Sequence, residues 1–408
     1  MARWFNGLWK KKTNNQTEQK AVTPTSQTTG GSSMLGYSVV GDPVWTPRSY
    51  AHLSKEGYEQ NVIVYRCVNL IARGAGSVKL SLMHGDHEVD RHPLLKLMNH
   101  PSPGQSGASF IESVMSHYLL SGNAYIEIVR DGQGKPVEMY SLRPDRVKAV
   151  PNKQGDIIAY DYKLDHGRET KRYPVDRLTG RSGILHLKLF HPLNDYYGMS
   201  PIEAAAKAID QHNAVAGHNL ALMQNGGRPS GVFIVKGGQG SQLTNEQREH
   251  LRHDIRNTYE GSANAGKIMM MEGDFEWKEM GLSPKDLDFA EGKFMAAREI
   301  AQAYGVPTML VGVPGESTFS NYREARMHLW EDTILPLLDQ LMGELNTWLL
   351  PLYGEHLRLA YDLDAIPALA LKRESHWARV SQTSFLTINE KRRELGFEPI
   401  KDGDELVM

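Results

Sequence analysis

Two long helices with the same start signal are the strongest constraint that this sequence sets on its fold. At Ser200-Pro201-Ile202-Glu203, serine suits the N-cap, proline suits the first helical position, and Glu203 is placed to bond back to the cap. These residues predict a helix over 200–226, which Gly226-Gly227 would end. Ser283-Pro284 repeats the signal and predicts a second helix over 282–305. At about 1.5 Å per residue, the first helix would be a rod roughly 38 Å long.

The connections that follow these two helices differ in kind. Residues 227–281 predict a small α/β insert, with strands over 231–235 and 267–271 and a helix between them that opens at Thr244. Residues 306–320 carry several glycines and prolines and predict a loop. A third helix is expected over 321–350. We expect Pro336 to kink this helix, because an interior proline removes one backbone hydrogen bond.

The flanking regions complete an α+β organisation. Residues 1–45 lack hydrophobic periodicity and predict a disordered arm. Residues 46–199 mix amphipathic helices with alternating strands, which predicts an α/β domain with two or three helices covering its strands. Residues 351–408 predict a strand, a helix, and a short helix opened by Thr387 with Glu390 three positions later. A chain of 408 residues is long enough for two or more domains.

The charge balance limits how this chain could hold nucleic acid. The 46 basic and 48 acidic residues give a net charge of −2. This balance argues against tight binding through phosphate contacts and is compatible with nucleic acid that slides past. Cys67 is the single cysteine, which excludes an intrachain disulfide and a cysteine-based zinc site and suits a reducing cytoplasm. We expect no membrane segment, because no apolar run approaches the roughly 20 residues that span a bilayer.

The motifs that could carry chemistry are incomplete, so we expect a protein that is not an enzyme and has no cofactor or metal. Gly238-Gln239-Gly240 lacks the third small residue and the lysine of a phosphate-binding loop. Gly198-Met199-Ser200 resembles part of a nucleophile elbow, but no second glycine follows, and the N-cap role explains Ser200. His250 and His253 lie one helical turn apart without a third metal ligand, which favours a solvated helix face.

Small and acidic residues on the two long helices admit two interpretations each. The small residues of the first helix are Ala204, Ala205, Ala206, Ala208, Ala214, Ala216, Gly217 and Ala221. They would let helices of neighbouring copies approach closely, and an ordinary alanine-rich core helix explains them equally well. The second helix carries Asp286, Asp288 and Glu291 in its early turns. Facing a lumen, they would repel phosphates and let DNA slide; a solvated face is the alternative.

Three blocks and the tail resemble, in order, the motifs of phage portal proteins of the HK97 type. The first block runs from DYYGMSPIEAAAKA into NGGRPSGVFIV (195–235), and the second is LSPKDLDFAEGKFMAAREIAQAYGVP (282–307). The third block begins STFSNYREA (317–325), and the tail runs from LTINEKRRELG to GDEL (386–406). SGNAYIEI and SLRPDRV, which lie earlier in the chain, also fit the family pattern. The resemblance covers about residues 55–408.

The resemblance implies a portal-type fold that assembles as a ring, commonly of twelve subunits. Residues 200–226 and 282–305 would be the two stem helices, and 227–281 would be a small α/β clip. Residues 306–320 would be a tunnel loop, 321–350 a long kinked wing helix, 46–199 most of the α/β wing, and 351–408 the remaining wing and a crown. Twelve helices, each roughly 10 Å across, would enclose a hole of roughly 28 Å. The contacts of such a ring are heterologous and close on rotation.

The implied function is a channel at one capsid vertex for packaging and ejection of double-stranded DNA and for head–tail joining. Expected partners are further copies of the chain, the large terminase, the major capsid protein or scaffold, and head-completion adaptors. The expected location is the virion, and the host cytoplasm during assembly. Candidate channel residues, which could act as a valve against back-slippage, are Gly312, Pro314, Gly315, Glu316, Ser317, Thr318 and Asn321. The alternatives are a head–tail adaptor ring, which predicts a shorter chain, and a nucleic-acid-processing enzyme, which predicts a metal or phosphate site.

Overall fold

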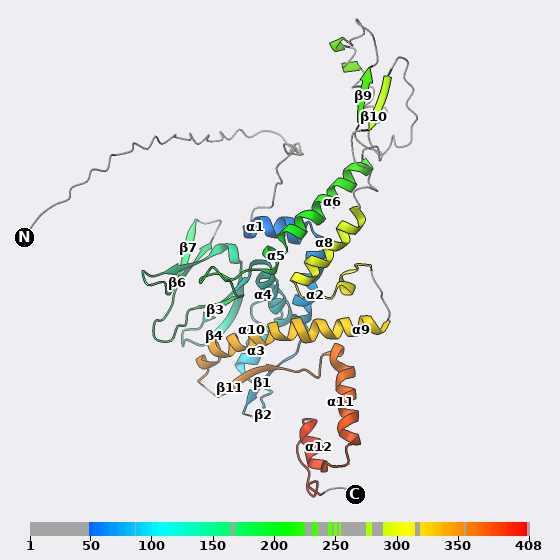
Figure 1. Ribbon diagram of the computed structural model, residues 1–408. Helices are drawn as coiled ribbons and strands as arrows, with labels where there is room; N and C mark the ends of the chain where they lie inside the picture. The colour runs from blue at the N-terminus through cyan, green and yellow to red at the C-terminus, as the bar shows by residue number, and fades with distance from the viewer. Residues whose placement is uncertain are drawn as a thin grey trace, which may run out of the picture. The chain divides into compact units, whose positions relative to one another are not determined.

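A computed structural model describes most of the chain from Ser49 to Glu405 (Figure 1). The described residues are 49–85, 87–164, 168–224, 231–235, 244–246, 249–250, 253, 275–279, 289–314, 319–354 and 356–405. Several predictions lie outside them: the arm over 1–45, the strand over 267–271, and the residues Ser283, Pro284, Asp286, Asp288, Gly315, Glu316, Ser317 and Thr318. Trp45–Met408 forms one compact unit.

One of the amphipathic helices expected within 46–199 is α2, which lies at the centre of the main core. α2 (Val62–Gly76) is preceded by α1 (Tyr50–Leu53) and a π-helical turn (Ser54–Glu59). Its residues Val64, Cys67, Val68, Ile71, Ala72 and Ala75 are fully buried. This face packs against α4 (Gly107–Ser121), the other helix predicted in this region, and α3 (Pro93–Asn99) precedes α4. The helix α3 was not predicted.

Three small antiparallel sheets complete this part of the chain. β3 (Asn123–Arg130) lies between β4 (Pro136–Leu142) and β8 (Ile184–Lys188). β5 (Val147–Pro151), β6 (Ile157–Leu164) and β7 (Glu169–Pro174) form a meander. β1 (Leu80–His84) pairs with β2 (His87–Glu88) and with the distant β11 (Leu357–Tyr361). The α+β class predicted from the sequence is confirmed, and β11 joins the C-terminal part of the chain to the N-terminal part.

The first long helix is present with an irregular first turn. Pro201–Ala204 forms α5 and Ala206–Gln224 forms α6, so the single helix predicted over 200–226 is wrong at Ala205. Ala205 has ψ near 0°, and its N–H donates to the carbonyls of both Pro201 and Glu203. The second helix is described from Phe289 to Ala303 as α8.

The insert between these helices contains an antiparallel strand pair. β9 (Gly231–Val235), which was predicted, pairs with β10 (Phe275–Glu279), which was not. Residues 245–246, 249–250 and 253 are helical, in the region where a helix opening at Thr244 was expected.

The third long helix contains a wider π-helical turn ahead of its proline. α9 (Phe319–His328) leads into a π-helical turn over Leu329–Ile334, and α10 (Leu335–Trp348) continues. In this turn the N–H of Leu335 donates to the carbonyl of Trp330, five residues back. Pro336 has no N–H, and its ring would meet the carbonyl of Asp332 in a regular helix, so the wider turn accommodates it. The irregularity expected at Pro336 therefore lies in the turn just before it.

The last helix of the chain begins at the capping motif that the sequence predicts around Thr387. Pro367–Leu369 forms a 3-10 turn, followed by α11 (Ala370–Gln382) and α12 (Ile388–Glu394). Thr387 and Glu390 form a complete capping box. Asn389, 3% exposed, accepts the N–H of Ile400 through Oδ1 at 2.8 Å and thereby ties the following segment to α12. No helix among the described residues is long and apolar enough to cross a membrane.

Candidate functional site

The helices α5, α6 and α8 form the element on which a channel wall would depend. α6 packs along α8, and α8 packs on α2. Ala205, Ala206 and Ala208 are buried, and they meet the buried alanines 296, 297 and 301 of α8 in the same core. Ala214, Gly217 and Ala221 of α6 are exposed instead, and their spacing of 3 and 4 places them on one helical face. Ala204, at the end of α5, is also exposed. The buried alanines fit the interpretation as a core helix, and the exposed small residues leave close approach of a neighbouring copy as an expectation.

The start of this element is joined to β3 by a close approach of two glycines. Gly122 ends α4 with φ +72°, and its carbonyl accepts the N–H of Leu189 at 2.8 Å. A Cβ on Gly122 would lie 2.6 Å from the carbonyl carbon of Met199. A Cβ on Gly198 would in turn collide with the carbonyl oxygen of Gly122. The SGN and YYGMSP motifs are thus two halves of one backbone contact.

The side chain of Asn123 stabilises this contact by a hydrogen bond to the backbone of Gly198. Its Oδ1 accepts the N–H of Gly198 at 2.8 Å, and His186 Nε2 lies 3.0 Å from the same oxygen. His186 stacks on Tyr125 with a ring separation of 4.3 Å, and burial lowers the pKa of His186 to about 3. The imidazole is therefore neutral at ordinary pH. These polar side chains serve to position the backbone before α5.

Ser200 occupies the structural position that the sequence predicts. Its Oγ accepts the N–H of Glu203 at 3.3 Å, and Pro201 is the first residue of α5. Ser200 is 1% exposed, which leaves no room for a substrate at its hydroxyl. The nucleophile-elbow alternative has no support in this geometry.

A buried polar cluster, which sequence reasoning missed, fixes the middle of α6 to the start of α2. Asn61 Oδ1 accepts the N–H groups of Ile63 and Val64, at 3.0 and 3.2 Å, and so caps α2. Asn61 Nδ2 donates to Asn213 Oδ1 at 2.9 Å and lies 3.2 Å from His212 Nδ1. Burial lowers the pKa of His212, and the charge of Lys293 lowers it further. We call Asn61, His212 and Asn213 the α6 anchor.

The C-terminal end of α8 is locked to the π-helical turn of the third helix. The N–H of Val306 donates to the carbonyl of Ala301 at 2.9 Å, and Gly305 adopts φ +66°, as in a Schellman cap. Thr333 Oγ1 donates to the carbonyl of Gly305 at 2.7 Å. A Cβ on Gly305 would lie 2.7 Å from that hydroxyl. The end of the second helix, which the sequence predicts at residue 305, is therefore also a contact with the third helix.

The loop predicted over 306–320 is largely folded in its first half. Thr308–Val311 forms a 3-10 turn whose Leu310 is buried, because this apolar run covers the core beside α8. Arg66 Nε donates to the carbonyl of Leu310 at 3.3 Å, and Arg298 donates to the carbonyl of Pro314 at 3.4 Å. Gly312 ends the turn with φ +80°.

The remaining channel candidates are dispersed over neighbouring elements. Pro314 and Glu291 are exposed, and Glu291 lies in the first turn of α8. Asn321 lies within α9 and is not part of the loop tip, because α9 begins two residues earlier, at Phe319. Pro336 is exposed and follows the π-helical turn.

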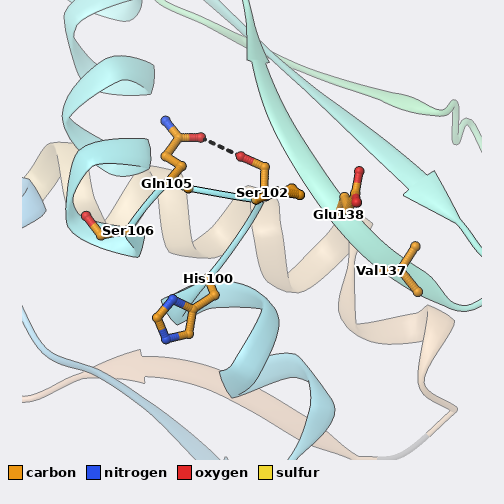
Figure 2. A pocket seen from close by; sticks show the side chains of 8 residues that line it. His100, Ser102, Gln105, Ser106, Val137 and Glu138 are labelled. Atoms are coloured by element: carbon orange, nitrogen blue, oxygen red, sulfur yellow. Dashed lines mark hydrogen bonds between the residues drawn. The ribbon is translucent and has the colours of Figure 1, made fainter.

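A surface hollow of about 490 Å³ lies beside the turn between α3 and α4 (Figure 2). Ser102 Oγ donates to Gln105 Oε1 at 3.1 Å, and Ser106 Oγ accepts the N–H of Ser109 at 3.2 Å as the cap of α4. Figure 2 shows Ser102 and Gln105 turned toward each other and His100 turned away from both. These groups shape the turn and do not converge on a common point. Within the part of the chain that the structure describes, no three His, Cys, Asp or Glu residues are grouped to hold a metal.

A mixed α/β body, a pair of long helices around a small insert, and an irregular third helix define a portal-type fold. The family model for "Phage portal protein" matches residues 62–396. An uncharacterised protein of Rickettsia bellii (strain RML369-C) is 43% identical over 353 residues, covering 86% of this chain and 90% of that protein. The portal protein of Enterobacteria phage HK97 is 24% identical over 419 residues, covering 98% and 91%.

Solved structures agree with this assignment. A chain in the neck of the native gene transfer agent particle, computed with C12 symmetry, has a TM-score of 0.67 and 40% identity, covering 88% of this chain and 96% of that chain. A phage portal protein of the HK97 family from Corynebacterium diphtheriae has a TM-score of 0.55 at 16% identity, covering 79% and 98%. The chain belongs to the phage portal protein family. The function predicted from the sequence, a portal ring for DNA packaging and head–tail joining, is confirmed at the level of this family.

Proposed function

We propose that twelve copies of this chain form the portal ring of a phage-like particle, through which double-stranded DNA enters and leaves. The observation that carries this proposal is the 40% identity, over 96% of that chain, to a chain in a particle neck whose structure was computed with C12 symmetry. The ring lies at one capsid vertex of the particle and joins head to tail.

The geometry supports an assignment of parts to this ring. The helices α5, α6 and α8 form the stem, and the insert that contains β9 and β10 forms the clip. The region from Tyr50 to Met199 and the irregular helix α9–α10 form the wing, with α11 and α12 in the crown. The exposed face of α6 with Ala214, Gly217 and Ala221 lies against the stem of the next copy, since small side chains permit close approach. Glu291 and the acidic residues before it face the lumen.

Residues 314–318 form the tip of the tunnel loop and act as a valve against back-slippage of DNA. The folded turn over Thr308–Val311 supports this role, because Arg66 bonds the carbonyl of Leu310 within the turn and Arg298 bonds the carbonyl of Pro314 at the start of the tip. Deletion of residues 315–318 should leave ring assembly intact and reduce the fraction of particles that retain full-length DNA. Normal filled particles from the deletion variant would exclude the valve.

The expected partners follow from the same assignment. The large terminase supplies the energy for translocation and meets the clip, and head-completion adaptors replace it there later. The major capsid protein or scaffold contacts the wing. Assembly takes place in the host cytoplasm, and the finished ring is a component of the virion.

The mass of the purified protein tests the proposed ring. Twelve copies of the 45.8 kDa chain give about 550 kDa, which light scattering separates from a monomer or a dimer. A particle of that mass that does not dissociate on moderate dilution agrees with the proposal. A protein that stays monomeric at high concentration and across salt conditions contradicts it.

A further inference from the structure

A groove of about 600 Å³ runs between α9 and α11, with the 3-10 turn Pro367–Leu369 beside it. These elements belong to parts of the chain about fifty residues apart, and the labels in Figure 1 locate them. The residues that line the groove are Arg323, Glu324, Arg326, Met327, Pro367, Ala368, Lys372, Ser375 and Arg379. Four of these side chains are cationic and one is a carboxylate.

The two arginines at the centre of this argument are not engaged within the subunit. Arg326 of α9 and Arg379 of α11 are exposed, and neither has an ion-pair or hydrogen-bond partner among the described residues. Lys372 is different, because its Nζ lies 2.5 Å from Glu331 Oε1. The groove therefore has two cationic heads available for an anion that comes from outside the subunit.

The arrangement of the lining suits an extended anion. Arg323 and Arg326 lie one helical turn apart on α9, and Lys372, Ser375 and Arg379 follow one face of α11. Arg326 and Arg379 place one available cation on each side of the groove, which suits successive negative groups along a chain better than a single carboxylate. Guanidinium groups bind phosphate oxygens in a planar, paired geometry, and Ser375 adds a hydroxyl donor. Met327, Pro367 and Ala368 supply an apolar floor.

We propose that this groove contacts the phosphates of double-stranded DNA as it passes the ring. The inference rests on the proposed portal function, because α9 begins directly after the segment assigned to the tunnel loop. The contact is independent of base sequence, since it involves charge and backbone oxygens. With one groove per subunit, the ring holds a circle of weak phosphate contacts beside the acidic stem.

The test compares a double variant with a charge-matched control. Arg326→Gln with Arg379→Gln removes the two available cations, whereas Arg177→Gln with Arg358→Gln removes two exposed arginines that do not line the groove. Binding of a short fluorescein-labelled duplex to the assembled ring is measured by anisotropy over a series of NaCl concentrations. Both exposed pairs are expected to leave folding intact, which circular dichroism checks.

We expect the groove variant to bind the duplex about tenfold more weakly at roughly 0.1 M salt, and the control to bind as the wild type does. The slope of log affinity against log salt should fall by about 1.8 for each subunit that loses two phosphate contacts. Intact variant rings with wild-type affinity and slope would overturn the groove proposal. Variant chains that no longer form rings would overturn it too, because the groove would then hold carboxylates of a neighbouring copy. A wild-type chain that forms no ring contradicts the proposed function instead.

Discussion

Replacing Gly122 with alanine should lower the free energy of unfolding by about 4 kcal/mol. Gly122 adopts φ +72°, where a side chain costs about 1–2 kcal/mol. The new Cβ would also lie 2.6 Å from the carbonyl carbon of Met199 and 2.7 Å from the carbonyl oxygen of Gly198. These are backbone atoms, so no side chain can rotate to make room. Asn123 holds that backbone in place through the N–H of Gly198, which adds to the cost of moving it.

The matched control for this substitution is Gly134→Ala. Gly134 has φ +82°, close to that of Gly122, but a Cβ there would meet nothing within 4 Å. Gly134→Ala should therefore lower the free energy of unfolding by only about 1–2 kcal/mol, the cost of a side chain at positive φ. Urea unfolding of both variants at equal protein concentration gives the difference. Equal losses at the two positions would show that the contact between the SGN and YYGMSP motifs does not stabilise the fold.

Replacing Asn61 with alanine should cost about 3 kcal/mol, because it removes the α2 cap and leaves buried partners unpaired. Asn61 is 1% exposed and serves two N–H groups of α2 as well as Asn213 and His212 of α6. Asn61→Asp keeps the cap oxygen but loses the amide donor to Asn213. The aspartate variant should therefore retain the stabilisation from the α2 cap and lose the hydrogen bond to α6.

Ser106→Ala provides the comparison for a cap alone. Ser106 caps α4, which has 15 residues like α2, through a single bond to Ser109, and Ser106 is exposed. Its loss should cost about 1 kcal/mol. Hydrogen exchange then localises the effect of the Asn61 substitutions. Amides of α6 should exchange faster than in the wild type in both Asn61→Ala and Asn61→Asp. Unchanged α6 exchange in Asn61→Ala would contradict the anchor.

Local signals in the sequence predicted the elements that local chemistry decides. Ser200-Pro201 and the Thr387–Glu390 box mark helix starts, because a cap needs only residues within one turn of each other. The burial of α2 follows from apolar spacing within 61–77. The π-helical turn over Leu329–Ile334 was anticipated only as a kink, since Pro336 requires an irregularity but does not determine which turn absorbs it.

Contacts between distant segments carried no such signal. Asn61 and Asn213 are 152 residues apart, so neither asparagine looks unusual in its own neighbourhood. The strand β10 was missed because Phe275–Glu279 mixes charged and aromatic residues, and only its pairing with β9 makes it a strand. The cationic groove combines single arginines from α9 and α11, each of which is ordinary on a helix surface. Gly122 and Gly198 both lie in motifs that resemble the family pattern, but the motifs do not show that the two glycines touch. The structure supplies that backbone contact.

End-on electron microscopy of the purified protein tests the portal assignment most directly. Averaged images classified without imposed symmetry should show closed rings with twelve equivalent subunits around an open central hole. The same particles viewed from the side should show a narrow stem and a wider wing. Images of monomers, of open filaments or of closed particles without a hole would contradict the account.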